Sequence, residues 1–256
     1  MLFRSYADKI TTDAFEVDIE LAYETLVCMT IWMEIAHYLN AAVTSCGDSL
    51  QEPIQAEMHI DSALAYYVGV KQTKGNSDGF LLYSLAQKSA IIFDTVDGDS
   101  GEALANVKLL QNFKAAKAKA GECDGSTGVT NEFRILIGSM MSQLNIPLVQ
   151  NFARQLQIGS ETEQGSAFSI LYGLAVLPQL KTCNPAEYFY LTNEITANGL
   201  SVAHIDDLIS SFKNVYSCFG ITCADVHGND SSSCNTDNLQ EAFAGFNPEV
   251  DVLPVS

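Results

Sequence analysis

The longest pattern in the chain is helical and runs from Phe15 to Val43. Apolar residues recur there at intervals of three and four, the spacing of one face of an α-helix. The stripe consists of Ile19, Ala22, Leu26, Met29, Met33, Ala36 and Val43, with Trp32 and Leu39 beside it. No glycine or proline interrupts the run. The pattern predicts one helix of about eight turns whose stripe packs against the rest of the protein.

Further helices are expected along most of the remaining chain. Apolar residues at helical intervals, bounded by polar and glycine-rich loops, mark the segments 54–68, 80–96, 103–120, 132–145, 147–158, 166–181, 185–197 and 201–217. Pro147 suits the first turn of a helix, and Pro178 should end or kink the helix that contains it. No segment alternates like a strand between hairpin turns. The sequence therefore predicts an all-α, multi-helix bundle.

The glycine-rich, polar segment 121–131 is the best candidate for a connector between two parts of the chain. It predicts an N-terminal helical lobe over 1–120, a C-terminal lobe over 132–219 and an irregular, cysteine-containing tail over 220–256. Two pairs of similar segments would suit a duplicated, two-lobed bundle: HIDSAL and HIDDLI, and GFLLYSLAQ and GSAFSILYGLAV. Their offsets differ, so no single repeat period explains both.

The charge of the chain limits its partners. Thirty-one Asp and Glu stand against 13 Lys and Arg among 256 residues, for a net charge of −18. Such an acidic protein repels nucleic acid and anionic lipid head groups, so neither is an expected partner. The negative charge either attracts cations or simply keeps the protein soluble. No apolar run approaches the roughly 20 residues that span a bilayer, and the N-terminus lacks the pattern of a signal peptide. We expect no transmembrane segment.

Seven cysteines stand at positions 28, 46, 123, 183, 218, 223 and 234. Cys28 lies in an apolar helical run and is expected to be a small buried hydrophobic residue. The other six lie beside loop signals, and their even number predicts three disulfides in an oxidising compartment. Zinc is the alternative, although no CxxC pair occurs. A glycosylation sequon at 229–231 also points to an extracellular or periplasmic protein.

The segment EMHIDSALAYYVG, residues 57–69, presents candidate metal ligands. Glu57, His59 and Asp61 occupy alternate positions, and side chains two apart on a helix point about 160° away from each other. All three can bind one ion only if the backbone is not yet helical there. Asp61 would also serve as the N-cap of a helix that begins after it. The sequence leaves both interpretations open, a metal site and a helix cap.

Glu34 and His37 form a second candidate group, since residues three apart share a helix face. Di-iron bundles use this motif twice, and the second copy is absent here. A mixed site remains, in which Glu34 and His37 meet the ligands of residues 57–61 across a short antiparallel connection. Carboxylate, imidazole and phenol donors, the last from the nearby Tyr66 and Tyr67, suit a hard or borderline cation such as Fe³⁺, Mn²⁺ or Zn²⁺.

Catalytic motifs are missing. The chain has no G-x-S-x-G elbow and no phosphate-binding loop, and DGDSGE at 97–102 does not match the spacing of an EF-hand. We therefore predict a protein that is not an enzyme. A di-metal oxidase or hydrolase is the least supported class, because the second carboxylate–histidine pair is missing.

The segments HIDSALAYYVG, FLLYSLAQKSAIIFDT and YSCFGITCADVHG resemble the algal iron-assimilating and high-CO2-inducible periplasmic proteins, a family found in green algae and diatoms. The resemblance covers mainly 54–120 and 200–228. It implies an extracellular protein linked to iron acquisition, but carries over no ligand residues. The leading expectation is a secreted, iron-binding protein. The alternative is a structural protein that assembles into an extracellular or cell-surface layer without metal.

Overall fold

A computed structural model describes residues 12–48, 53–70, 72–159, 163–196 and 204–227. Within these ranges the chain is helical, and its β-structure is limited to an isolated bridge between Val96 and Ala103. The prediction of an all-α bundle is confirmed. The elements are α1 (Thr12–Thr25), η2 (Leu26–Ile31), α2 (Trp32–Gly47), α3 (Pro53–Val68), α4 (Leu82–Ile92), α5 (Leu104–Ala120), α6 (Thr127–Gly159), α7 (Glu163–Val176), η3 (Leu177–Gln179), α8 (Leu180–Cys183), α9 (Pro185–Thr196), α10 (Ile205–Lys213), η5 (Tyr216–Phe219) and α11 (Cys223–His227).

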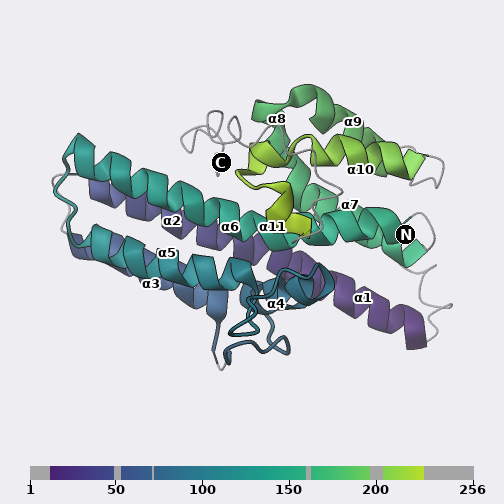
Figure 1. The fold of residues 1–256 in the computed structure, drawn as a ribbon, viewed down its shortest axis with the longest axis horizontal. Helices are drawn as coiled ribbons and strands as arrows, with labels where there is room; N and C mark the ends of the chain where they lie inside the picture. Colours follow the sequence, from purple (N-terminus) through teal and green to yellow (C-terminus); the bar gives the residue numbers. More distant parts are fainter. Residues whose placement is uncertain (1–11, 49–52, 71, 160–162, 197–203, 228–256) are drawn as a thin grey trace, which may run out of the picture.

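Four helices form the centre of the fold. α2 packs on α3, α3 on α5, α5 on α6 and α6 on α2, so that the four close a ring around one core. Figure 1 shows α5 and α6 lying over α3 and α2. Each helix contributes apolar residues at intervals of three and four, which the geometry of the helix places on one face. The inward residues include Ile35, Leu39, Ala42, Ile60, Ala63, Tyr67, Leu109, Phe113, Ala116, Phe133, Ile137, Met140 and Leu144.

α6 is 33 residues long and joins this bundle to the rest of the molecule. Its later turns contact α4, α7, α10 and α11 (Figure 1). The two helices predicted for 132–145 and 147–158 are thus one helix, and the prediction of a break at Pro147 is wrong. Pro147 is buried inside α6, and its carbonyl oxygen accepts a hydrogen bond of 2.8 Å from Asn151 Nδ2. A proline inside a helix costs about 3 kcal/mol, through the lost backbone hydrogen bond and a steric clash. The packing of α6 against its neighbours outweighs this cost.

The predicted long N-terminal helix is also present, as α1, η2 and α2 in succession. Ala36 of the predicted stripe and the neighbouring Trp32 and Leu39 are buried, but other buried residues differ from the prediction. Val27, Cys28 and other residues of a different face lie in the core. Ile19, Leu26 and Met33 of the predicted stripe are 54%, 52% and 49% exposed. The helix is apolar on more than one side, so a period alone did not identify the side that packs. The π-helical turn η2 also changes the angular relation between the residues before and after it.

By length and composition, the helix Ile19–Gly47 could cross a membrane, with a mean hydropathy of 1.3 and 33% of the tested window buried. A core helix passes the same test, so this finding is compatible with the expected absence of a transmembrane segment.

Two disulfides join segments that are far apart in the sequence. Cys46 at the end of α2 is bonded to Cys123 in the turn after α5, and Cys183 to Cys218. Cys223 is disulfide-bonded as well, and Cys234 lies outside the described residues. Cys28 is free and buried, as predicted. The segment 121–131, predicted as a connector, forms the turn between α5 and α6 and the first turn of α6. Beyond residue 227, the predicted tail is not described.

Candidate functional site

α2 and α3 carry all five predicted metal ligands, Glu34 and His37 on the first helix and the other three on the second. α3 begins at Pro53, so the interpretation of Asp61 as an N-cap is wrong. Proline favours this earlier start, because its fixed φ suits the first turn and its missing N–H would have no partner there. Glu57, His59 and Asp61 thus lie on one continuous helix, on which adjacent members of the set point about 160° apart.

The two carboxylates of α3 face α5. Lys117 Nζ lies 2.7 Å from Asp61 Oδ1 and 2.6 Å from Asp61 Oδ2. Glu57 Oε1 lies 3.1 Å from the position that a Cβ atom on Gly121, just after α5, would occupy. Asp61 is therefore engaged by an ammonium group. The carboxylates and His59 project from different sides of α3.

Both histidines lie against the ring of Tyr38 on α2. The ring centroid of Tyr38 lies 5.7 Å from that of His37 and 6.0 Å from that of His59. Tyr66 stacks on Tyr38, with centroids 5.7 Å apart and an interplanar angle of 23°. We call these four residues the ring cluster. Partial burial, and then the neighbouring His37 imidazole, lower the pKa of His59. Both effects favour the neutral imidazole, which is the form that binds metal.

Glu34 stands one turn before His37 on α2 and is half-buried. A helix places residues three apart on the same side, so Glu34 is the carboxylate of the predicted set that shares a face with a histidine. Among the described residues, no group of three or more His, Cys, Asp or Glu side chains could hold a metal ion. The structure thus places both histidines beside Tyr38, whereas Asp61 pairs with Lys117 and Glu57 lies near Gly121.

Tyr38 and Tyr66 complete this cluster. Sequence analysis named Tyr66 as a nearby phenol donor, but it singled out neither tyrosine as the contact between the histidines. A signal exists for Tyr66: it follows His59 by seven residues, two helical turns, and thus lies on the same side of α3. Tyr67 is a core residue, buried and hydrogen-bonded to Asn106. Nothing comparable marks Tyr38, because its contacts come from another helix.

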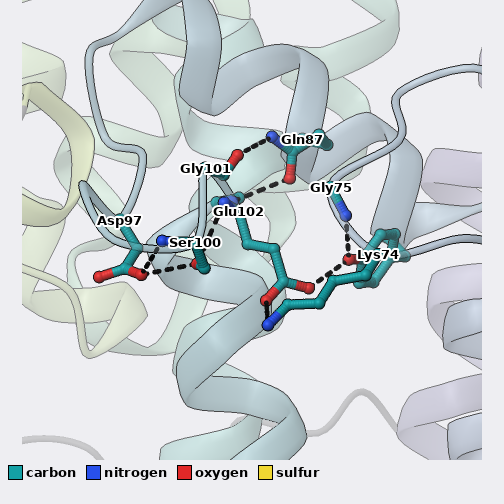
Figure 2. A network of polar contacts seen from close by, with 9 residues as sticks. Lys74, Gly75, Gln87, Asp97, Ser100, Gly101 and Glu102 are labelled. Carbon is teal, nitrogen blue, oxygen red and sulfur yellow. Dashed lines mark hydrogen bonds and ion pairs between the residues drawn. The ribbon is translucent and has the colours of Figure 1, made fainter.

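The acidic loop after α4 is held by a polar network (Figure 2). Glu102 is buried, accepts a 2.7 Å hydrogen bond from Tyr83 Oη and pairs with Lys74 Nζ at 3.0 Å. Gln87 donates to Gly101 O at 2.9 Å and accepts from Ala103 N at 2.8 Å. The Glu102 carboxylate is therefore neutralised by a lysine, and the network ties the loop before α4 to the loop after it.

A partly buried carboxylate, Glu24, lies between α1 and α7. Tyr172 Oη donates a 2.7 Å hydrogen bond to Glu24 Oε2. Burial raises the pKa of Glu24, and the hydrogen bond from Tyr172 opposes that rise. Burial also raises the pKa of the nearby Cys28 thiol, so that this cysteine is unreactive. Sequence analysis missed this contact, since it joins residues 148 positions apart.

Comparison with known proteins identifies no relative: no family model, no curated protein and no solved structure matches this chain. The disulfides indicate an oxidising, extracellular-type environment.

Proposed function

We propose that this chain is a non-catalytic, secreted or periplasmic helical protein that binds a borderline divalent cation, Zn²⁺ or Cu²⁺, at His37 and His59. The observation that carries the proposal is the approach of these two imidazoles, from neighbouring helices, to the same tyrosine ring. Both helices belong to the four-helix bundle, so their packing places both side chains beside Tyr38 before any ion binds.

The donor set decides between cations. Imidazole suits Zn²⁺, Cu²⁺ and Ni²⁺, whereas hard ions such as Fe³⁺ favour oxygen ligands. The carboxylates that would supply those oxygens, Glu57 and Asp61, face α5, and Asp61 pairs with Lys117. The residues therefore fit ferric iron poorly, and a role in iron assimilation rests on the family resemblance. Water and Glu34 are the available further ligands of a bound divalent ion.

Calorimetric titration of the full chain with Zn²⁺, Cu²⁺ and Fe³⁺ near pH 7.5 tests the proposal. We expect Zn²⁺ or Cu²⁺ to bind at about one equivalent, and His37→Ala or His59→Ala to weaken binding at least about tenfold, a loss of about 1.4 kcal/mol. His204→Ala, an exposed histidine at the start of α10, is the matched control and should leave the affinity unchanged.

Asp61→Asn separates this proposal from the site predicted by sequence. We expect it to leave the metal affinity unchanged, because Asp61 pairs with Lys117 on the other side of α3. A loss equal to that of the histidine variants would support the original five-ligand site. If neither Zn²⁺ nor Cu²⁺ binds, the proposal is wrong.

The exposed apolar residues of the long N-terminal helix favour the second candidate function, a structural protein that assembles into an extracellular or cell-surface layer. Assembly of the purified protein into filaments or regular particles as its concentration rises, without added metal, would favour this second function.

A further inference from the structure

The ring cluster supplies two histidine side chains to a bound metal ion. His37 lies on α2 and His59 on α3, and both rings lie against Tyr38. Glu34 shares a side of α2 with His37, yet in the described part of the chain no three His, Cys, Asp or Glu side chains form a group that could hold a metal ion. Zn²⁺ takes four ligands in a tetrahedron at structural sites in proteins. One chain therefore supplies half of such a site.

The ring cluster lies at the surface, where a second molecule can reach it. The His37 side chain is exposed and His59 is half-buried. Tyr66, which stacks on Tyr38, is 37% exposed. Met33 is 49% exposed and precedes His37 by four residues on α2, so it lies on the same side of that helix. The histidines are therefore accessible ligands, with apolar and aromatic side chains beside them.

We propose that a second copy of this chain completes the site, so that one Zn²⁺ joins two chains through His37 and His59 of each. This inference rests on the proposed metal-binding function of the ring cluster and names its partner. Because both chains use the same two residues, a twofold axis through the ion relates them, as in most homodimers. The four imidazoles then form the closed tetrahedral set that Zn²⁺ prefers.

Charge makes this association depend on the metal. Each chain has a net charge of −18. α2 and α3 carry Glu34, Glu57 and Asp61 and contain no Lys or Arg, although Lys117 of α5 pairs with Asp61. Like charges on two facing surfaces disfavour association. A dication bound between the chains offsets part of this repulsion, and its bonds to the imidazoles supply the attraction. The chain is therefore expected to be monomeric without zinc.

The number of ions per chain distinguishes a shared ion from one completed by water or Glu34. An ion completed by water or Glu34 belongs to one chain, which stays monomeric at every zinc concentration. A shared ion gives one ion for two chains when zinc is limiting. In large zinc excess each chain binds an ion of its own, so the dimer dissociates and both arrangements reach the same end point of about one equivalent.

Sedimentation velocity of the full chain at three zinc levels tests the inference, at a protein concentration well above the zinc dissociation constant from calorimetry. In chelator we expect a monomer of 27.8 kDa. With about half an equivalent of Zn²⁺ we expect a species of about twice that mass, and in large zinc excess a monomer again.

His37→Ala and His59→Ala should each reduce the dimer fraction at half an equivalent at least about tenfold, since the shared ion keeps only two imidazoles. His204→Ala is the matched control, because His204 is exposed at the start of α10, and this variant should dimerise like wild type. Circular dichroism checks that each variant keeps its helical fold.

The possible failures are distinguishable. A chain that binds Zn²⁺ through both histidines but stays monomeric at half an equivalent would overturn this inference and leave the proposed function intact. Binding of Cu²⁺ without any binding of Zn²⁺ would do the same, whereas binding of neither ion would overturn both. Dimerisation in chelator, or a zinc-dependent dimer that survives both histidine substitutions, would place the interface elsewhere and contradict the shared site.

Discussion

At the scale of single residues, Glu24 shows how burial changes the chemistry of a carboxylate. Its hydrogen bond from Tyr172 holds α1 against α7, and Lys88 and Arg154 partly offset the effect of burial on its pKa. Glu20, the other nearby carboxylate, raises the pKa further. The net effect is a raised pKa, so the folded protein binds a proton at Glu24 more tightly than the unfolded chain does.

The sign of this shift predicts a pH dependence. The contribution of Glu24 to stability is complete below its unfolded pKa and is lost as pH rises through its raised, folded-state pKa. Glu24→Gln removes the charge but keeps an oxygen that accepts from Tyr172. Near pH 7 we expect this variant to have a free energy of unfolding higher than that of wild type by on the order of 1 kcal/mol, and thus a higher unfolding temperature. Near pH 4 we expect no difference between the two proteins. Thermal unfolding followed by circular dichroism at both pH values measures this, and a destabilised variant at pH 7 would contradict it.

At the scale of helices, close packing at Gly173 sets how α7 meets its neighbours. A Cβ atom at this position would collide with Ile195 Cδ1 of α9 and lie 3.2 Å from Phe152 Cε2 of α6. α7 packs on both α6 and α9. The absence of a side chain at position 173 thus allows α7 to approach both α6 and α9 closely.

Gly173→Ala should therefore reduce the free energy of unfolding, by about 1–3 kcal/mol, because the core must move to accept the methyl group. Gly128→Ala is the matched control: Gly128 is helical too, and a Cβ atom there would meet nothing within 4 Å. The control should be neutral or stabilising by up to about 1 kcal/mol, from its better helix propensity. Chemical denaturation of both variants compares them, and equal effects would refute the packing argument.

At the scale of the whole molecule, the Cys46–Cys123 disulfide closes a long loop. Its cysteines are 77 residues apart, and the bond joins the end of α2 to the turn between α5 and α6. Cys183 and Cys218 are only 35 residues apart. A longer loop loses more entropy in the unfolded chain when it is closed, so the first bond is expected to contribute more to stability.

Cys46→Ala/Cys123→Ala should reduce the free energy of unfolding by about 4 kcal/mol, and Cys183→Ala/Cys218→Ala by somewhat less. Denaturation under non-reducing conditions measures both double variants. The reverse order, with the shorter loop contributing more, would show that contacts in the folded state rather than loop entropy decide the effect.

The sequence by itself determined the local structure. Intervals of three and four specify helices without tertiary help, so α3, α5 and the unbroken N-terminal helix were predicted close to their observed positions. Pro178 ends α7 at Val176 as expected, because proline cannot continue the backbone hydrogen bonds. Cys28 was correctly predicted as a buried free thiol from its apolar surroundings.

Only the tertiary structure decided which neighbour each side of a helix packs against. The long N-terminal helix is apolar on several sides, and its packing partners selected Val27 and Cys28 for the core and left Leu26 and Met33 exposed. The same choice divided the predicted ligands: α2 lies beside His59, and α5 beside Asp61. Helical periodicity gives the angle between two side chains on one helix, but not the neighbour that each side chain meets. That neighbour depends on contacts between residues far apart in the chain.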